Sequence, residues 1–223
     1  MTTNPITKAK SLRNDTNLLI GTFGLTRTKQ SQRLSDLLDT TTVEPIPEIE
    51  TARLEKHRQR LDIEGDFWNE EELKMRFLSV IFEIVDFEET NKIKLFYERA
   101  LMNIVQEHKL SVVVDCLLAT PFGIGEPAAP YFFLQEFKRQ KNDNDAEGQM
   151  LAAMLIAQTR NADDKPVYGC NIQGKYWTFS ILHGKEYSVS EALAATKPSD
   201  LIQIVQALRR LKATILAQLA NDN

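Results

Sequence analysis

The chain has 223 residues, of which 43% are hydrophobic and 26% charged, so it is long enough to bury a sizeable core. Its formal net charge of −4 excludes a uniformly basic protein that attracts polyanions over its whole surface, and any such partner must be met by local patches. No stretch reaches the roughly 18 apolar residues of a membrane span, and the polar N-terminus lacks the apolar centre of a signal peptide. We therefore expect a cytoplasmic protein without a membrane partner.

The N-terminal part of the chain differs in composition from the rest. Residues 1–46 are expected to form a polar extension and linker, and residues 47–223 a single domain. Up to about Gln32 the extension is rich in Thr, Asn, Ser and Lys, which predicts a disordered or loosely attached segment. Within it, Leu18–Phe23 is a candidate for a docked strand. Pro47–Arg60 has the pattern of a polar helix with too few apolar positions for deep burial, which would lie across the core or mediate a homodimer.

Helical and strand-like segments alternate through the remainder. Asn69–Val85 carries apolar residues at helical spacing, and its start is marked by Asn69 followed by three glutamates in the first turn. Three strands, a helix, a hairpin and a last helix are predicted after it. Their ranges in chain order are Lys94–Val105, Leu110–Leu118, Tyr131–Lys138, Asp145–Thr159, Val167–Ile172, Tyr176–Leu182 and Ser199–Leu219. This alternation predicts one α/β domain.

Charged residues stand near the ends of two of these apolar strands. Residues two apart in a strand project to the same side, so Glu136 and Lys138 point together while Phe137 points toward a core. If the strand of Asp115 pairs with theirs, two carboxylates stand close enough to hold a hard cation such as Mg²⁺. Such an ion polarises a phosphodiester and activates a water, and a neighbouring lysine stabilises the developing charge. The alternative is a surface aspartate and a Glu/Lys pair on a solvated sheet. The continuously apolar run 131–134 favours a site, because unpaired carboxylates at the end of a buried strand are costly.

The order Asp115…Glu136-Phe137-Lys138 resembles the motif of the PD-(D/E)XK nuclease superfamily. The resemblance covers roughly the middle and C-terminal two thirds of the chain, although Val114 stands where many members have a proline. It implies a restriction-endonuclease-like core, which is a mixed β-sheet flanked by helices in the order αβββαβ, preceded here by a helical or irregular extension. It also implies that Asp115, Glu136 and the backbone carbonyl of Phe137 bind Mg²⁺ or Mn²⁺, and that Lys138 assists the attacking water.

Two further site residues are implied by the same resemblance. Gln149 lies in the helix after the Glu136 strand, where similar nucleases often place a Gln or Lys that faces the active site. Glu72 lies one turn into the first long helix, where related enzymes often carry an acid that reaches the metal through water. The alternative for Gln149 is an ordinary solvated helix residue. For Glu72 it is a first-turn acid that favours the helix dipole and pairs with Arg76.

Other chemistry has little support in the sequence. The three histidines, His57, His108 and His183, lie in different segments and show no metal-ligand spacing. Cys116 and Cys170 lie in apolar strands without a Cys-x-x-Cys motif, which predicts buried, reduced thiols.

The leading hypothesis is a metal-dependent phosphodiesterase that hydrolyses nucleic acid, DNA more than RNA, as an endonuclease of the restriction or repair type. The basic runs Lys138–Lys141 and Arg209–Lys212 are candidate contacts to its substrate, or else solvated loop and helix faces. The alternative is a catalytically silent protein of the same fold that acts as an interaction or nucleic-acid-binding subunit, because fold does not settle function. A third hypothesis is an RNA-directed function. A partner subunit could supply specificity, since the chain has no evident DNA-reading module.

Overall fold

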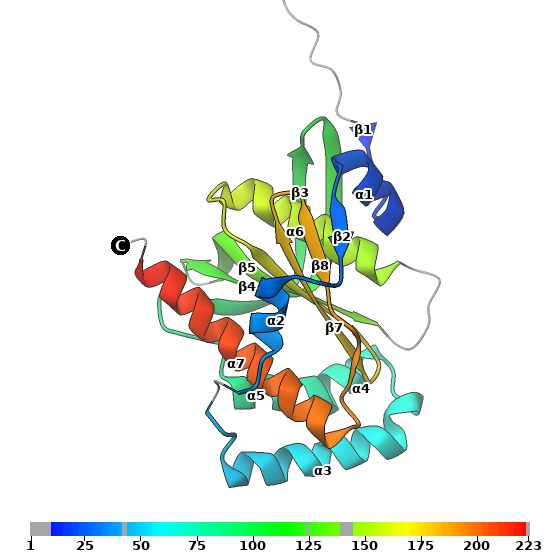
Figure 1. The fold of residues 1–223 in the computed structure, drawn as a ribbon, viewed down its shortest axis with the longest axis vertical. Coiled ribbons are helices and arrows are strands. Elements are labelled where there is room, and N and C mark those ends of the chain that lie inside the picture. The colour runs from blue at the N-terminus through cyan, green and yellow to red at the C-terminus, as the bar shows by residue number, and fades with distance from the viewer. Residues whose placement is uncertain (1–9, 42–43, 124, 139–144, 222–223) are drawn as a thin grey trace, which may run out of the picture.

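The computed structural model describes residues 10–41, 44–123, 125–138 and 145–221, which form an α/β protein with helices on both faces of a mixed sheet (Figure 1). The sheet runs in the order β1-β4-β5-β6-β7-β8-β2, with β3 also paired to β4 and β9 to β7. The pairs β1–β4, β5–β6 and β2–β8 are parallel and the others are antiparallel. The strand bounds are β1 (Lys10–Ser11), β2 (Thr26–Thr28), β3 (Lys94–Val105), β4 (His108–Phe122), β5 (Glu126–Lys138), β6 (Val167–Gln173), β7 (Tyr176–His183), β8 (Glu186–Val189) and β9 (Leu193–Ala194).

The helices divide between the two faces of the sheet. In Figure 1, α6 and α1 lie on the upper side of the sheet, while α3, α5 and α7 lie below it. A π-helical turn separates α4 from α5, so that the chain is helical from Glu70 to Val85. The helix bounds are α1 (Thr16–Phe23), α2 (Gln32–Leu38), α3 (Glu48–Glu64), a short 3₁₀ turn (Gly65–Phe67), α4 (Glu70–Leu73), the π-helix (Lys74–Leu78), α5 (Ser79–Val85), α6 (Ala146–Asn161) and α7 (Pro198–Ala220).

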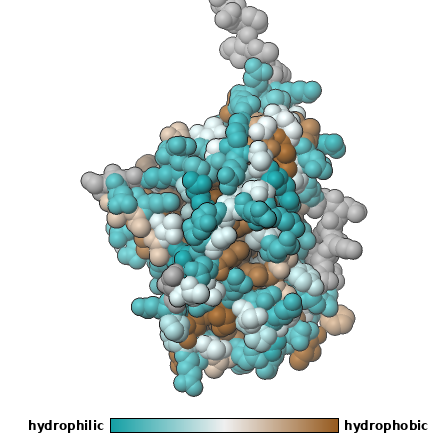
Figure 2. Space-filling model, viewed as in Figure 1, coloured by the Kyte–Doolittle hydropathy of each residue, from teal (hydrophilic) through white to brown (hydrophobic). Residues whose placement is uncertain are grey.

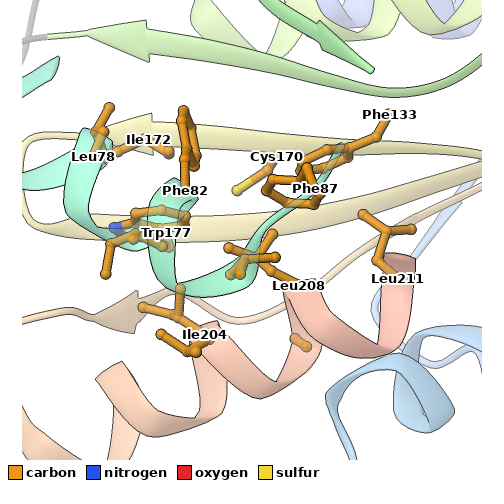
Figure 3. Close-up of a cluster of buried hydrophobic side chains, with 14 of the residues drawn as sticks. Leu78, Phe82, Phe87, Phe133, Cys170, Ile172, Trp177, Ile204, Leu208 and Leu211 are labelled. Carbon is orange, nitrogen blue, oxygen red and sulfur yellow. The ribbon is translucent and has the colours of Figure 1, made fainter. Parts of the chain in front are cut away.

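Two hydrophobic clusters, one on each face, hold these layers together. The first joins α5 and α7 to the sheet through buried side chains that include Phe82, Phe133, Trp177 and Leu208 (Figure 3). The second packs α1 and α6 on the opposite face. Because β5 is covered on both sides, Tyr131 to Phe137 are all buried, as the apolar run predicts. Both described cysteines are buried and free, which confirms the prediction of reduced thiols.

Most elements of the central region form where the sequence predicts them. β3 has the predicted bounds, α6 and α7 differ from them by at most two residues at either end, and the predicted hairpin is β6–β7. β4 and β5 extend further than predicted, toward the turn that joins them. Asp145 caps α6 by accepting a hydrogen bond from the backbone N–H of Gly148, which fixes the start of that helix.

The N-terminal segment departs from the prediction. Residues 10–41 are not a loose extension, because β1 and β2 join the sheet and both Leu19 and Phe23 are buried. Leu18–Phe23 belongs to the helix α1 rather than to a strand: Asp15 caps its first turn and Gly24 ends it in the left-handed region. α3 is helical as predicted, but its leucines at 54 and 61 are fully buried, contrary to expectation.

The face seen in Figure 1 is largely hydrophilic, with smaller hydrophobic patches between polar side chains (Figure 2). Among the residues that the structure describes, no helix has both the length and the apolar character needed to cross a membrane.

Candidate metal and phosphodiester site

The predicted site lies where β4 and β5 stop pairing. The last paired residues on this side of the β4–β5 ladder are Cys116 and Gln135. Beyond them, the backbone N–H of Phe137 donates a hydrogen bond of 2.6 Å to the side-chain Oδ2 of Asp115. A side-chain oxygen thus replaces the backbone acceptor that a regular ladder would provide. Asp115 is only 8% exposed. Its carboxylate is therefore fixed in the gap that opens between the two strands.

A second irregularity on β3 and β4 also falls at Asp115. Val114 packs in the cluster on the α6 face, whereas Cys116 packs in the cluster on the α7 face, so the strand alternation breaks between them. On the neighbouring strand, Tyr97 pairs with Cys116 and Arg99 pairs with Val114, and Glu98 between them has a φ of 52°. A positive φ is uncommon for a residue other than glycine. The register is the same on both sides, so this irregularity sets Glu98 opposite Asp115 without a ladder pair.

Glu136 and Lys138 project from β5 into the same place. The Nζ of Lys138 lies 2.8 Å from Glu136 Oε1 and 3.9 Å from Asp115 Oδ2, so one ammonium group bridges the two acids. It also lies 3.6 Å from Oε1 of Glu70 at the start of α4. The structure thus brings Asp115, Glu136 and Lys138 together from two neighbouring strands.

Burial strongly perturbs the acid at the centre of this group. Glu136 is 2% exposed, and its burial raises its pKa to about 7, against the hydrogen bond from Lys138; the charge of Asp115 raises it further. Burial alone would lower the pKa of Lys138, but its hydrogen bond with Glu136 and the surrounding carboxylates raise that pKa instead. The contact with Lys138 therefore does not offset the cost of burying the charge of Glu136.

A second lysine, which sequence reasoning missed, contacts Asp115 from the other side. Lys74 begins the π-helix, and its Nζ lies 3.8 Å from Asp115 Oδ1, 2.9 Å from Glu98 and 3.1 Å from Glu71. Only its place near the start of the helix, among glutamates, could have drawn attention to it. Neither the π-helical turn that contains Lys74 nor the positive φ of Glu98 is visible as a pattern in the sequence.

Of the two further residues predicted for the site, Gln149 lies beside it and Glu72 does not. Gln149 lines an open cleft of about 460 Å³ together with Asp115, Glu136 and Lys138, and its Oε1 is buried without a hydrogen-bond partner among the described residues. Glu72 is not brought to the site. It completes a capping box with Asn69 and lies 3.1 Å from Arg76, which matches the alternative reading of this residue.

The predicted basic runs contribute little free positive charge. Residues 139–141 of the first run lie outside the described part of the chain. In the second, Arg209 pairs with Glu50, Arg210 donates to the backbone carbonyl of Asp39, and Lys212 donates to that of Asp86. These contacts tie α7 to neighbouring elements.

The donor chemistry of the site fits a hard divalent cation. Among the described residues, five carboxylates (Glu70, Glu71, Glu98, Asp115 and Glu136) surround two ammonium groups (Lys74 and Lys138). Oxygen ligands of this kind suit Mg²⁺ or Mn²⁺. No group of three or more His, Cys, Asp or Glu side chains is arranged as a metal cluster within the described ranges, so a bound ion would rely on Asp115, Glu136 and a non-side-chain ligand such as the Phe137 carbonyl.

No family model matches the chain, and no curated protein compared with it matches either. The functional interpretation therefore depends on the geometry and chemistry of the site.

Proposed function

We propose that this protein is a Mg²⁺- or Mn²⁺-dependent phosphodiesterase that hydrolyses nucleic acid, DNA more than RNA, on a restriction-endonuclease-like core. The observation that carries the proposal is the convergence of Asp115, Glu136 and Lys138 in the gap between β4 and β5. Two nearly buried acids beside each other oppose folding, since burial and like charge both disfavour ionisation. A binding role for a cation accounts for their presence.

In this proposal each residue has a separate task. Asp115 and Glu136 would hold the ion through carboxylate oxygens, and Phe137 would add its backbone carbonyl. The bound ion supplies charge neutralisation at the phosphate and a water of lowered pKa. Lys138 stabilises the additional negative charge of the transition state, because its ammonium group already lies within 4 Å of both acids. Gln149, whose Oε1 has no hydrogen-bond partner among the described residues and which lines the same cleft, would orient the attacking water through that acceptor.

The alternative is a catalytically silent protein whose charged residues serve interaction or stability. The specific observation in its favour is that the ammonium groups of Lys138 and Lys74 lie within 4 Å of the acids and partly compensate their charges. The proposal includes an activity of the restriction or repair type and a preference for DNA over RNA. It also includes a homodimer or a partner subunit that supplies specificity.

The decisive experiment measures cleavage and metal binding on the same variants. The purified protein should cut nucleic acid with Mn²⁺ or Mg²⁺ and not with EDTA. Lys138→Ala should reduce cleavage at least a hundredfold while retaining Mn²⁺ binding by calorimetry, because the lysine acts on transition-state charge. Asp115→Asn should lose both. The matched control is Lys109→Ala, an exposed lysine near the start of β4, which should behave as the wild type.

The substrates should include single-stranded, double-stranded and branched DNA, and RNA. Absence of cleavage on all of them with Mn²⁺ would contradict the enzyme and favour the silent alternative. Undiminished cleavage by Lys138→Ala would show that the activity arises elsewhere.

A further inference from the structure

A second cavity, of about 530 Å³, opens next to the candidate site, on the side of Lys74. Its walls include Met75, Phe82, Tyr97 and Phe137, so it is more apolar than the cleft that holds Glu136 and Lys138. Met75 is 73% exposed and Tyr97 is 50% exposed, which is unusual for large apolar or aromatic side chains grouped on one surface. Its volume lies within the roughly 300–1,000 Å³ of small-ligand sites.

The cavity is continuous with the proposed phosphodiester site. Asp115 and Glu98 line both the cavity and the cleft, so the two spaces meet at the gap between β4 and β5. Asp115 presents one carboxylate oxygen to Lys138, on the cleft side, and the other to Lys74, on the cavity side. A ligand whose phosphate lies in the cleft would therefore have its adjoining group within reach of the cavity.

The charged residues on the cavity wall favour some classes of ligand over others. Glu71 and Glu98 line it, and both contact Lys74, whose ammonium group also lies 5.9 Å from the centre of the Phe137 ring. Carboxylates repel a phosphate but accept hydrogen bonds from the exocyclic amino groups of bases. Aromatic and apolar side chains stack on the face of any base. This combination suits a nucleobase better than a backbone phosphate or a purely apolar ligand.

We propose that this cavity receives one unpaired nucleobase of the substrate, next to the bond that is cut. The inference rests on the proposed function and narrows it: the preferred substrate would be single-stranded or frayed nucleic acid, because a base in a duplex cannot leave its partner without loss of pairing and stacking. Tyr97 provides the main stacking surface, and Met75 borders it.

The test compares a fluorescent single-stranded 12-nucleotide DNA with the corresponding blunt duplex, with Ca²⁺ in place of Mn²⁺ to slow cleavage. Tyr97→Ala should weaken binding of the single strand about tenfold and leave duplex binding nearly unchanged. Tyr97→Phe should retain affinity, since stacking needs only the ring. The matched control is Tyr176→Ala, which removes another half-exposed tyrosine that lines a different cavity. Thermal unfolding of each variant checks the fold, and Met75→Ala, at the exposed rim, provides a second perturbation that should also weaken single-strand binding.

The outcomes separate this inference from the proposed activity. If the wild type cuts DNA but Tyr97→Ala and Met75→Ala bind and cut single strands as the wild type does, the base pocket is wrong and the nuclease stands. If no substrate is cut but single-strand binding depends on Tyr97, the pocket stands and the enzyme does not. Equal losses for Tyr97→Ala and Tyr176→Ala would overturn the specific pocket.

Discussion

Replacing Glu136 with glutamine should stabilise the metal-free protein at alkaline pH and have little effect at acidic pH. The reason is that Glu136 is 2% exposed and that burial raises its pKa from the usual 4.5 to about 7. Below about pH 4.5 the carboxyl is protonated in both the folded and unfolded states, so its ionisation contributes nothing. Between pH 4.5 and 7 the unfolded chain releases the proton and the folded protein retains it, so stability falls as pH rises. Above pH 7 the carboxyl is ionised in both states, so the folded protein bears the full cost of the buried charge.

The size of the effect follows from this shift. One pKa unit corresponds to about 1.4 kcal/mol, so a rise of the Glu136 pKa from 4.5 to about 7 gives an upper bound of roughly 3 kcal/mol. Glutamine keeps an amide oxygen to which Lys138 can donate, and the lost charge attraction over 2.8 Å is already contained in the raised pKa. The gain falls below this bound because the buried amide N–H groups of glutamine also need hydrogen-bond acceptors. We therefore expect a net gain of about 2 kcal/mol at pH 8.5, or about 4–8 °C in Tm for a chain of this size.

The assay is thermal and urea unfolding of the wild type and Glu136→Gln at pH 5 and 8.5, in EDTA. Glu107→Gln, at the exposed turn between β3 and β4, is the matched control and should show the same small effect at both pH values. Adding Mg²⁺ at pH 8.5 should stabilise the wild type and remove much of the difference between it and Glu136→Gln. A stability difference that is the same at both pH values, or a destabilised variant at pH 8.5, would refute the argument that burial of the Glu136 charge opposes folding.

Two further predictions concern the fold around the site. Glu72→Ala should lower stability by about 1 kcal/mol, because Glu72 completes the capping box with Asn69. Its Mn²⁺ affinity in calorimetry should be unchanged, and a loss of affinity would show that Glu72 contributes to the metal site. Gly148→Ala should lower Tm markedly, because a Cβ there would lie 2.4 Å from the backbone oxygen of Asn14 and would push the N-terminal segment from α6; an unchanged Tm would show that this segment contributes little to stability.

The central part of the fold could be predicted because its signals are local. The long apolar strands, the caps and the helical periodicity lie in contiguous stretches, so β3, α6 and α7 formed close to the predicted bounds. The sequence offers Leu18–Phe23 as a candidate strand because a short helix and a strand have similar apolar content at this length. The flanking Asp15 and Gly24 were the better signals, since a side-chain cap and a left-handed glycine mark the two ends of a helix.

The site could be predicted only in part, for a related reason. Strand parity joins Glu136 to Lys138, and the order of strands brings Asp115 beside them. The contribution of Lys74 depends on a π-helical turn, and that of Glu98 on a positive φ in the middle of a strand, and neither has a recognisable local sequence pattern. The sequence also does not show which of the three successive glutamates Glu70, Glu71 and Glu72 reach the site.

The structure gives each of these three glutamates a different contact. These contacts bear on whether the charged residues form a binding site or only a network of ion pairs. Glu72 turns back to cap the helix, while Glu70 approaches Lys138 and Glu71 approaches Lys74. Glu70, Glu71 and Glu98 remain partly or largely exposed, so their ion pairs contribute little to stability. Asp115 and Glu136, in contrast, are nearly buried side by side, and their like charges oppose folding. Binding of a cation would account for two buried acids in one place, because the ion compensates both charges. The pH dependence of Glu136→Gln stability and its response to Mg²⁺ therefore test the same physical imbalance from which the proposed activity is inferred.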